Sequence, residues 1–357
     1  MRLKVLHIIN SMTLGGAEVL LANSLSKGGL NEFTDNWLVF LQKGSDLLDR
    51  VDKNVKVIDL KYKGFFDLPR TLFELRKIIK ENKIDILHSH LTPAGLYAQL
   101  SCPKMIPHIH SLHAPYSMNT ETNRKMLFLE RYLYLKNKST KVICLTEFTR
   151  ADFIKAINFT GESFVLNNFV ADAFFSHKPK IYQNSGRSLK IAGSGTLKKL
   201  KNFEYLLEVF TYLKNYNITL DIYGSGDTTE YENYITTNGI KVCMKGCRTD
   251  MENALEYYDI FAVPSIFESF SLSGFEAMAA GLPLMVSDIE PLKNIMKSNA
   301  IYFPLNNALA TAQIIIDIYN GITNVNELAQ KGHEYALKTV KREAHIKELL
   351  SIYNQIL

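Results

Sequence analysis

The sequence predicts two successive α/β domains, each built on a doubly wound parallel sheet. Three observations carry this prediction. Short apolar runs alternate with amphipathic segments along the whole chain. A polar stretch at 176–187 (SHKPKIYQNSGR) interrupts the alternation near the middle. With 357 residues, the chain is long enough to bury two cores. We therefore expect one domain over residues 1–170 and a second over 171–338.

The first half alternates strand-like and helix-like segments from its first residues onward. Because a strand–helix–strand unit brings its two strands side by side and parallel, this order predicts one parallel sheet. The expected helices lie at 19–26, 71–83, 94–100 and 121–136. The expected strands lie at 3–9, 37–41, 55–60, 84–90, 108–113, 141–146 and 164–166.

The second half repeats the alternation after the polar stretch. Ligands of parallel α/β sheets bind beyond the carboxyl ends of the strands, and the unusual residues of both halves follow strands. Two such rims facing each other would form a ligand site in a cleft between the domains. The expected helices lie at 203–213, 251–258, 274–280, 306–320 and 325–357, and the expected strands at 188–195, 219–226, 241–246, 260–263 and 283–287.

Charge is distributed unevenly along the chain. Of a net charge of +5, residues 1–165 carry 23 basic and 16 acidic side chains, which gives +7, and the remaining 18 and 20 give −2. A basic half suits an anionic membrane surface. The charges are scattered among apolar helices, which disfavours nucleic acid as a partner.

The four cysteines are irregularly spaced, which predicts reduced thiols and a cytoplasmic protein, with peripheral contact at the inner face of the membrane as an option. No run approaches the ~18 apolar residues of a membrane span.

The stretch 261–281 (FAVPSIFESFSLSGFEAMAAG) is the most informative part of the sequence. An apolar strand is followed by a polar loop and then by a helix of small residues. The amino end of a helix offers unpaired N–H groups and a partial positive charge, so this loop is suited to phosphate. Two carboxylates, Glu268 and Glu276, bracket the loop.

The residues of this stretch, and four candidates outside it, also allow plainer interpretations. Ser273 and Glu276 have the spacing of a capping box, in which the glutamate only closes the helix end. Glu268 and the basic turn containing Lys201 could be solvated surface, His113 could be a structural strand-end histidine, and Gly15–Gly16 could be a simple turn.

Six motifs together resemble the GT-B glycosyltransferases of family GT4, nearly from end to end. They are GGAE at 15–18, DILHSH at 85–90, VLNN at 165–168, GTLKKLKN at 195–202, IYGSGD at 222–227 and PSIFESFSLSGFEAMAAGLP at 264–283. The last is highly specific, and the order of the others adds weight. The resemblance implies two Rossmann-like domains facing across a cleft, with a final helix at about 339–357 that crosses back to the first domain.

The resemblance also implies roles for individual residues. Glu268, His113 and Lys201 would be catalytic, with Lys201 as a diphosphate clamp and the other two on the donor sugar. Thr196 stands where an arginine is common in this family. No D-x-D carboxylate pair is found, so no metal and no other cofactor is expected. The implied donor-binding residues are Gly15, Gly16, Thr196, Lys201, Gly224, Arg248, Phe270, Ser271, Leu272, Ser273 and Glu276.

The function implied is that of a retaining glycosyltransferase. It would move a sugar from a nucleotide diphosphate sugar, with UDP favoured over GDP, to a hydroxyl of a saccharide or lipid-linked saccharide in bacterial surface polysaccharide assembly. A non-catalytic partner subunit and a nucleotide-sugar epimerase or phosphorylase of the same fold are the alternatives. The basic, aromatic segment 124–138 is either a core helix with outward cations or a helix that faces a membrane.

Overall fold

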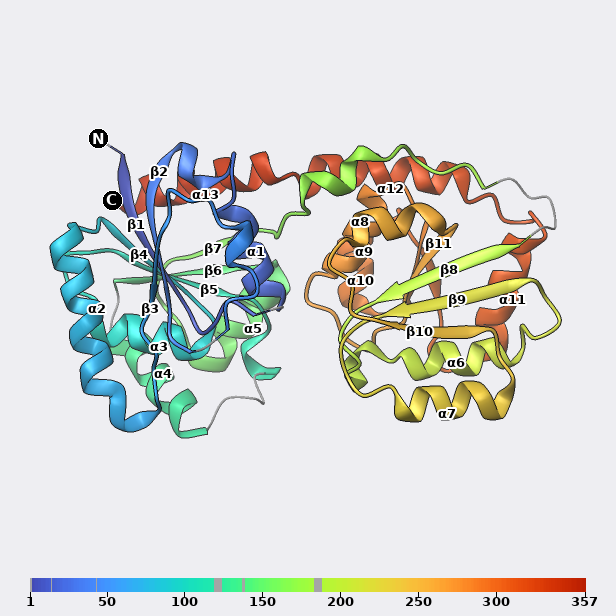
Figure 1. Cartoon of the computed structure of the whole chain (residues 1–357), viewed down its shortest axis with the longest axis horizontal. Helices are drawn as coiled ribbons and strands as arrows, with labels where there is room; N and C mark the ends of the chain where they lie inside the picture. The colour runs from blue at the N-terminus through green and yellow to red at the C-terminus, as the bar shows by residue number, and fades with distance from the viewer. Residues whose placement is uncertain (1, 14, 43, 119–123, 137–138, 183–187) are drawn as a thin grey trace. The chain divides into compact units, whose positions relative to one another are not determined.

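The computed structural model describes the chain except residues 1, 14, 43, 119–123, 137–138 and 183–187. The chain divides into two compact units, which Figure 1 shows coloured along the sequence. Unit 1 comprises Met1–Asn168 and Arg342–Leu357, and unit 2 comprises Phe169–Lys341. Each unit holds one parallel sheet flanked by helices. The predicted fold class, two Rossmann-like α/β domains, is confirmed.

The sheet of unit 1 has the order β3-β2-β1-β4-β5-β6-β7, and every neighbouring pair is parallel. The strand order reverses between β1 and β4, which is where doubly wound sheets bind ligands. All seven strands agree with predicted segments. They are β1 (Leu3–Ile9), β2 (Thr34–Phe40), β3 (Lys56–Asp59), β4 (Ile86–His90), β5 (His108–Leu112), β6 (Thr140–Cys144) and β7 (Ser163–Val165).

Helices cover both faces of this sheet. Apolar side chains of α1 and α13 pack with Val5, Leu38 and Ile86 on one face. Those of α2 and α3 pack on the other face with Leu6 and Val39. The helix predicted at 121–136 is described from Arg124, and its residues 121–123 lie outside the described part. The helices are α1 (Gly16–Ser24), α2 (Leu68–Asn82), α3 (Thr92–Ser101), α4 (Arg124–Lys136), α5 (Glu147–Ile157), which was not predicted, and α13 (Arg342–Ile356).

The sheet of unit 2 has the order β10-β9-β8-β11-β12-β13, again parallel throughout. Five strands agree with the prediction. The edge strand β13, three residues long, was not predicted. The strands are β8 (Leu189–Ser194), β9 (Ile218–Tyr223), β10 (Val242–Gly246), β11 (Ile260–Val263), β12 (Leu284–Ser287) and β13 (Ile301–Phe303).

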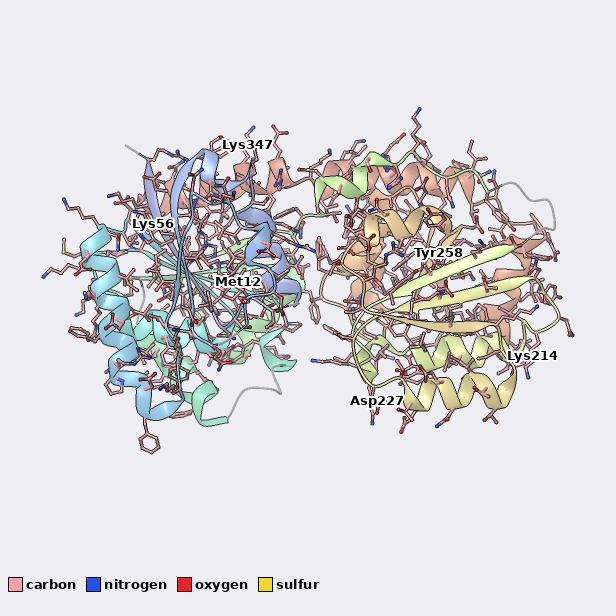
Figure 2. All side chains as sticks on the ribbon, in the orientation of Figure 1. Met12, Lys56, Lys214, Asp227, Tyr258 and Lys347 are labelled. Carbon is pink, nitrogen blue, oxygen red and sulfur yellow. The ribbon has the colours of Figure 1, made fainter. Side chains whose placement is uncertain are left out.

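Helices also cover both faces of the second sheet. Side chains of α6, α7 and α11 join one apolar core with the strands, whereas α9 packs against α12, β11 and β12. Side chains fill the space between sheet and helices in each unit, with Met12 and Tyr258 among the buried ones (Figure 2). The helices are α6 (Phe203–Thr211), α7 (Thr229–Asn238), α8 (Met251–Ala254), α9 (Leu272–Ala279), α10 (Glu290–Met296), α11 (Ala308–Tyr319) and α12 (Asn326–Thr339); α7 and α10 were not predicted.

The single helix predicted at 325–357 is wrong, because the chain breaks between α12 and α13. Val340 leaves the helical region with φ −129°, and its carbonyl accepts a hydrogen bond from Val170 N–H at 2.9 Å. Lys341 forms a bridge with Val170. The break separates α12, which belongs to unit 2, from α13, which belongs to unit 1. Both helices are amphipathic, so hydrophobic period alone did not reveal it.

Tyr353 fixes α13 to its sheet through a buried hydrogen bond of 2.6 Å with His88 Nδ1. Tyr353→Phe should lower the free energy of unfolding by about 1–3 kcal/mol, because it leaves that ring nitrogen unpaired in the core. Tyr132→Phe, at a half-exposed position on α4, is the matched control and should cost under about 0.5 kcal/mol. Urea unfolding checks both, and equal costs would contradict the assigned bond.

Candidate functional site

The most specific sequence motif folds as strand β11, a loop and helix α9. The helix begins at Leu272, two residues earlier than predicted, and Ser271 precedes it with φ 60° and no side-chain cap. The capping-box interpretation of Ser273 and Glu276 is therefore wrong, since Ser273 lies inside the helix. The first N–H groups of α9 have no partner within the helix and are suited to an anion.

Glu268 and Lys201 meet at the carboxyl ends of two neighbouring strands. Lys201 ends a short 3-10 helix, Lys199–Lys201, that follows β8, and its Nζ forms an ion pair with Glu268 Oε1. Ser265 Oγ donates a hydrogen bond of 3.2 Å to the same oxygen. Glu268 is only 8% exposed. The alternative of a solvated loop carboxylate is excluded for this buried, paired side chain.

Backbone contacts hold the two loops together. Ile266 N–H donates to the Leu200 carbonyl at 3.0 Å, and the Asn202 amide donates to the Pro264 carbonyl at 3.2 Å. Because these bonds join the segment after β8 to the segment after β11, the Lys201–Glu268 pair is held by backbone on both sides.

Glu276 lies in the first turns of α9 and is half-buried. Burial, and then the nearby Glu252 carboxylate, raises the pKa of Glu276 to about 8, while Lys201 opposes the shift. Lys201 thus influences both predicted glutamates. Glu252, on the short helix α8, was not predicted, because a lone glutamate in a polar segment gave no signal.

The loops after β8 and β9 are in close contact. A Cβ on Gly224 would lie 1.8 Å from the carbonyl oxygen of Gly195, so only glycine fits. Thr196 is exposed next to this contact. Arg248 follows the edge strand β10 and forms a two-bond ion pair with Asp250, at 2.6 and 2.9 Å. Arg248 is therefore committed to another partner.

The predicted loop residues differ in what they expose. The Phe270 ring is buried and stacks on Phe275, with ring centroids 4.9 Å apart, so only its backbone is left for a ligand. Ser271 Oγ is buried and has no hydrogen-bond partner among the described residues. Leu272 and Ser273 are half-buried in the first turn of α9.

In unit 1, Gly15 and Gly16 form the start of α1. A Cβ on Gly15 would lie 2.3 Å from the Glu18 carboxylate, which folds back over it, whereas one on Gly16 would meet nothing within 4 Å. Burial raises the pKa of Glu18. A side chain at position 15 would require only that the flexible Glu18 carboxylate move, and no atom within 4 Å constrains position 16.

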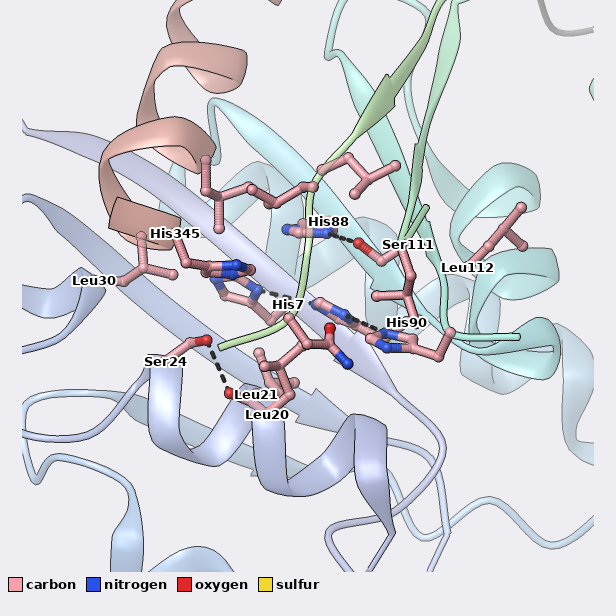
Figure 3. A pocket seen from close by; sticks show the side chains of 16 residues that line it. His7, Leu20, Leu21, Ser24, Leu30, His88, His90, Ser111, Leu112 and His345 are labelled. Atoms are coloured by element: carbon pink, nitrogen blue, oxygen red, sulfur yellow. Dashed lines mark hydrogen bonds between the residues drawn. The ribbon is translucent and has the colours of Figure 1, made fainter. Parts of the chain in front are cut away.

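His113 follows β5, is partly buried and lies against a group of buried histidines. Its Nε2 lies 3.4 Å from His90 Nδ1, and its own Nδ1 is buried without a hydrogen-bond partner among the described residues. Burial, and then the neighbouring His345, lowers the pKa of His113 to about 4. His345, on α13, was missed because it is remote in sequence. Figure 3 shows His7, His88, His90 and His345 around a cavity of about 30 Å³ that His113 also lines.

Within the described chain, His7, His88 and His90 are the residues that could hold a metal ion, with ligand atoms within 4.8 Å of one another. Each of their ring nitrogens already has a hydrogen-bond partner at 2.6 to 3.4 Å. A metal would have to displace these bonds. His88 and His90 are thus satisfied by hydrogen bonds within unit 1.

The fold is that of the GT-B proteins. The structure of Anabaena HepE in complex with UDP superimposes with a TM-score of 0.81 over 99% of this chain and 100% of that one, at 15% identity. Two family models match adjoining segments. Residues 17–174 match "Glycosyltransferase Family 4", and residues 176–342 match "Glycosyl transferases group 1".

Curated relatives are glycosyltransferases as well. The chain is 25% identical over 248 residues to the Escherichia coli UDP-Gal:alpha-D-GlcNAc-diphosphoundecaprenol alpha-1,3-galactosyltransferase. The matched region covers 64% of each chain. It is 25% identical over 305 residues to the Staphylococcus aureus poly(ribitol-phosphate) alpha-N-acetylglucosaminyltransferase, covering 81% of this chain and 59% of that one. The chain spans just under two thirds of the length of the first curated relatives that it matches. By fold and by both family models, the chain is related to glycosyltransferases.

The contact between Gly224 and Gly195 generates a test of the loop geometry. Gly224→Ala should destabilise unit 2 by more than about 3 kcal/mol, because backbone must move to admit the methyl group. Gly239→Ala is the control, since it has φ 59° but no atom within 4 Å, and it should cost about 1 kcal/mol. Thermal unfolding measures the loss of stability in both variants. Similar losses would show that the loops after β8 and β9 can separate freely.

Proposed function

We propose that the protein is a retaining glycosyltransferase that uses a nucleotide diphosphate sugar, with UDP as the nucleotide. The observation that carries the proposal is the Lys201–Glu268 ion pair beside Glu276 at the open amino end of α9. These groups lie in the unit that matches the glycosyl transferases group 1 model. The family names and the relatives' names support the reaction class.

In this proposal unit 2 binds the donor. Lys201 and the N–H groups of 270–273 bind the diphosphate, and Glu276 binds ribose hydroxyls. Thr196 and Gly224 line the diphosphate region through their backbone. Arg248 can bind the donor only if its ion pair with Asp250 breaks. Arg248 is therefore the weakest of the predicted donor contacts. Glu268 accepts hydrogen bonds from the donor sugar, and unit 1 contributes Gly15, Gly16 and His113.

The chemical step breaks the bond between the sugar's anomeric carbon and a diphosphate oxygen. An acceptor hydroxyl oxygen forms the new bond on the same face of the sugar. The hydroxyl proton moves to the departing diphosphate oxygen, so no protein base is required. Negative charge accumulates on that diphosphate, and a fixed cation and N–H groups aimed at it are the largest catalytic contribution available. We propose no metal and no other cofactor.

Substrate and place are proposed from the relatives. HepE was crystallised with UDP, and the galactosyltransferase is named for UDP-Gal and a diphosphoundecaprenol acceptor. A saccharide or lipid-linked saccharide is accordingly the proposed acceptor, in cytoplasmic assembly of a bacterial surface polysaccharide. The non-catalytic alternative is disfavoured because Lys201, Glu268 and Glu276 are all in place although Thr196 replaces a cation.

Helix α4 supports contact with a membrane surface. Phe128, Tyr132 and Leu135 are 74%, 46% and 48% exposed and recur at helical spacing, which places them on one side. Arg131 and Lys136 are exposed on the same helix. An apolar stripe flanked by cations suits an anionic interface. In the described parts of the chain, no helix is both long and apolar enough to cross a bilayer.

A ligand panel tests the donor. UDP, GDP and their sugars are screened by thermal shift, since a ligand of the folded state stabilises it by mass action. UDP-sugars should raise the melting temperature most, and stabilisation by none of them would contradict the proposal.

Turnover tests the site. Lys201→Met should lower kcat by roughly a hundredfold or more, because the leaving diphosphate loses its cation. Lys199→Met, in the same turn, is the matched control and should retain most activity. Equal losses would contradict the role of Lys201. Product NMR should show the anomeric configuration of the donor.

Membrane contact is tested with vesicles that contain anionic lipid. Replacing Phe128, Tyr132 and Leu135 by serine should weaken binding at least about tenfold, because the apolar insertion is lost. Serine at Leu309 and Ile322, which are exposed apolar residues of unit 2, is the control and should leave binding unchanged. Equal binding by all three proteins would rule out the α4 surface.

A further inference from the structure

Seven of the nine histidines lie in unit 1, five of them buried and two partly buried. Three of the seven, His7, His90 and His113, form an end-to-end chain at one face of its sheet. Register places the side chains of His7, His90 and Asn36 on that face, which α1 and α13 cover. His7 Nδ1 lies 3.4 Å from His90 Nε2, and His90 Nδ1 lies 3.4 Å from His113 Nε2. Figure 3 labels the first two of these rings, His7 and His90. This run of histidines ends at His113, the residue that the proposed function places at the donor sugar.

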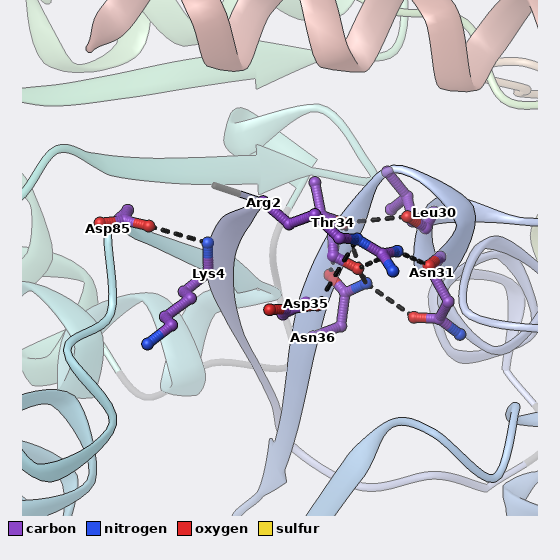
Figure 4. Close-up of polar contacts among 8 residues, drawn as sticks. All are labelled: Arg2, Lys4, Leu30, Asn31, Thr34, Asp35, Asn36 and Asp85. Carbon is purple, nitrogen blue, oxygen red and sulfur yellow. Dashed lines mark hydrogen bonds and ion pairs between the residues drawn. The ribbon is translucent and has the colours of Figure 1, made fainter.

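The far end of the chain is fixed by an asparagine. His7 Nε2 lies 3.2 Å from Asn36 Oδ1. The Asn36 amide nitrogen donates to the Thr34 carbonyl at 3.2 Å and to Asn31 Oδ1 at 2.7 Å, as Figure 4 shows. Asn31 in turn donates its own amide nitrogen to the Leu25 carbonyl at 2.8 Å. The network therefore assigns the Asn36 atom next to His7 as oxygen, which only accepts.

This acceptor sets the proton position on each ring in turn. A neutral imidazole has one N–H and one bare nitrogen. His7 must carry its proton on Nε2 to donate to Asn36, so its Nδ1 is bare and accepts from His90 Nε2–H. His90 Nδ1 is then bare and accepts from His113 Nε2–H. His113 Nδ1 is left as a lone-pair acceptor.

The rings stay neutral because they are buried together. Burial lowers the pKa of His7 to about 4 and the pKa of His113 to about 4. Burial and the neighbouring rings hold the pKa of His90 well below its usual range. At neutral pH the order of donors and acceptors is thus decided by hydrogen bonding.

The end of the chain meets a space that needs a donor. Among the residues that the structure describes, His113 Nδ1 is buried and has no hydrogen-bond partner, and the same holds for Asn168 Oδ1, whose residue lines the same cavity. The cavity of about 30 Å³ has room for one water molecule or one hydroxyl group. Both atoms accept hydrogen bonds, so the occupant must donate them.

We propose that Asn36, His7 and His90 are positioning residues that hold His113 in its Nε2-protonated form, so that His113 Nδ1 is a fixed acceptor for a hydroxyl group of the sugar substrate. The identity of the ligand rests on the proposed function, whereas the proton positions do not. His88 is not part of the chain, although its ring lies 4.2 Å from that of His90, because it bonds to Tyr353 and Ser111.

NMR of isotope-labelled histidine rings tests the proton positions in the protein without ligand. Nitrogen shifts separate a protonated ring nitrogen from a bare one, and single histidine substitutions assign the signals. His7, His90 and His113 should each be protonated on Nε2. Protonation of His113 on Nδ1 would overturn the proposal without touching the proposed function.

Two substitutions test the connection. His90→Leu removes the acceptor of His113 Nε2–H, so His113 should become a mixture of both protonated forms. His88→Leu is the matched control on the same sheet face and should leave His113 unchanged. Equal effects of the two substitutions on His113 would contradict the proposed hydrogen-bonded run of histidines. If His90→Leu does not fold, the spectrum of the unsubstituted protein still decides.

Binding tests the ligand, with UDP, UDP-glucose and UDP-galactose as probes. His90→Leu should weaken the UDP-sugars about tenfold, as expected for one hydrogen bond, and leave UDP unchanged. The His113 signal should shift with a UDP-sugar and not with UDP. If UDP-sugars bind without shifting it, the site holds water and the ligand assignment fails. If neither UDP nor UDP-sugars bind, the proposed function fails while the ring spectra stand.

Discussion

A carboxylate that is 8% exposed, as Glu268 is, remains charged only where a cation or hydrogen bonds balance it. Lys201 and Ser265 supply that balance. The parallel pairing of β8 with β11 makes this possible, because it brings two loops from distant parts of the sequence to the same sheet edge. The amino end of α9 and Glu276 lie in the segment that follows, so the donor-side proposals all depend on this pair.

Close backbone packing supports the pair. Gly224 lies so near the Gly195 carbonyl that no side chain fits, and Leu197 N–H bonds to the Ser225 carbonyl at 2.9 Å. The loop that carries Lys201 is therefore fixed from the β9 side as well as from the β11 side. Such support suits a site that must present a charge in one place before its ligand arrives.

The hydrophobic periods and the turn residues of the sequence predicted most of the fold. Contacts between distant segments determined the remaining features. Every strand of the first sheet was predicted. The central strands are buried and appear as short apolar runs between turns. The hydrophobic period missed the break at Val340, since both flanking helices are amphipathic and the break coincides with pairing to Val170. The resemblance had implied a final helix at about 339–357, and α13 lies there. The start of α9 was predicted two residues late because Ser271 adopts a left-handed conformation that its sequence does not signal.

The candidate site likewise contains residues that the sequence predicted and residues that only the structure revealed. The motif at 195–202 located Lys201, and the motif at 264–283 located Glu268 and Glu276. The structure shows Lys201 and Glu268 in contact. Glu252, His345 and the order of the buried histidines depend on contacts between distant segments, which one sequence does not show. Arg248 was predicted because it follows the expected strand at 241–246, and its pairing with Asp250 depends on the local loop.

Hydrogen exchange with bound UDP tests the central claim most directly, since it reads the backbone N–H groups assigned to the diphosphate. UDP should slow exchange at the start of α9, over residues 270–276, and around Lys201 in unit 2. Saturating UDP that leaves these amides unchanged, or protects only unit 1, would contradict the account.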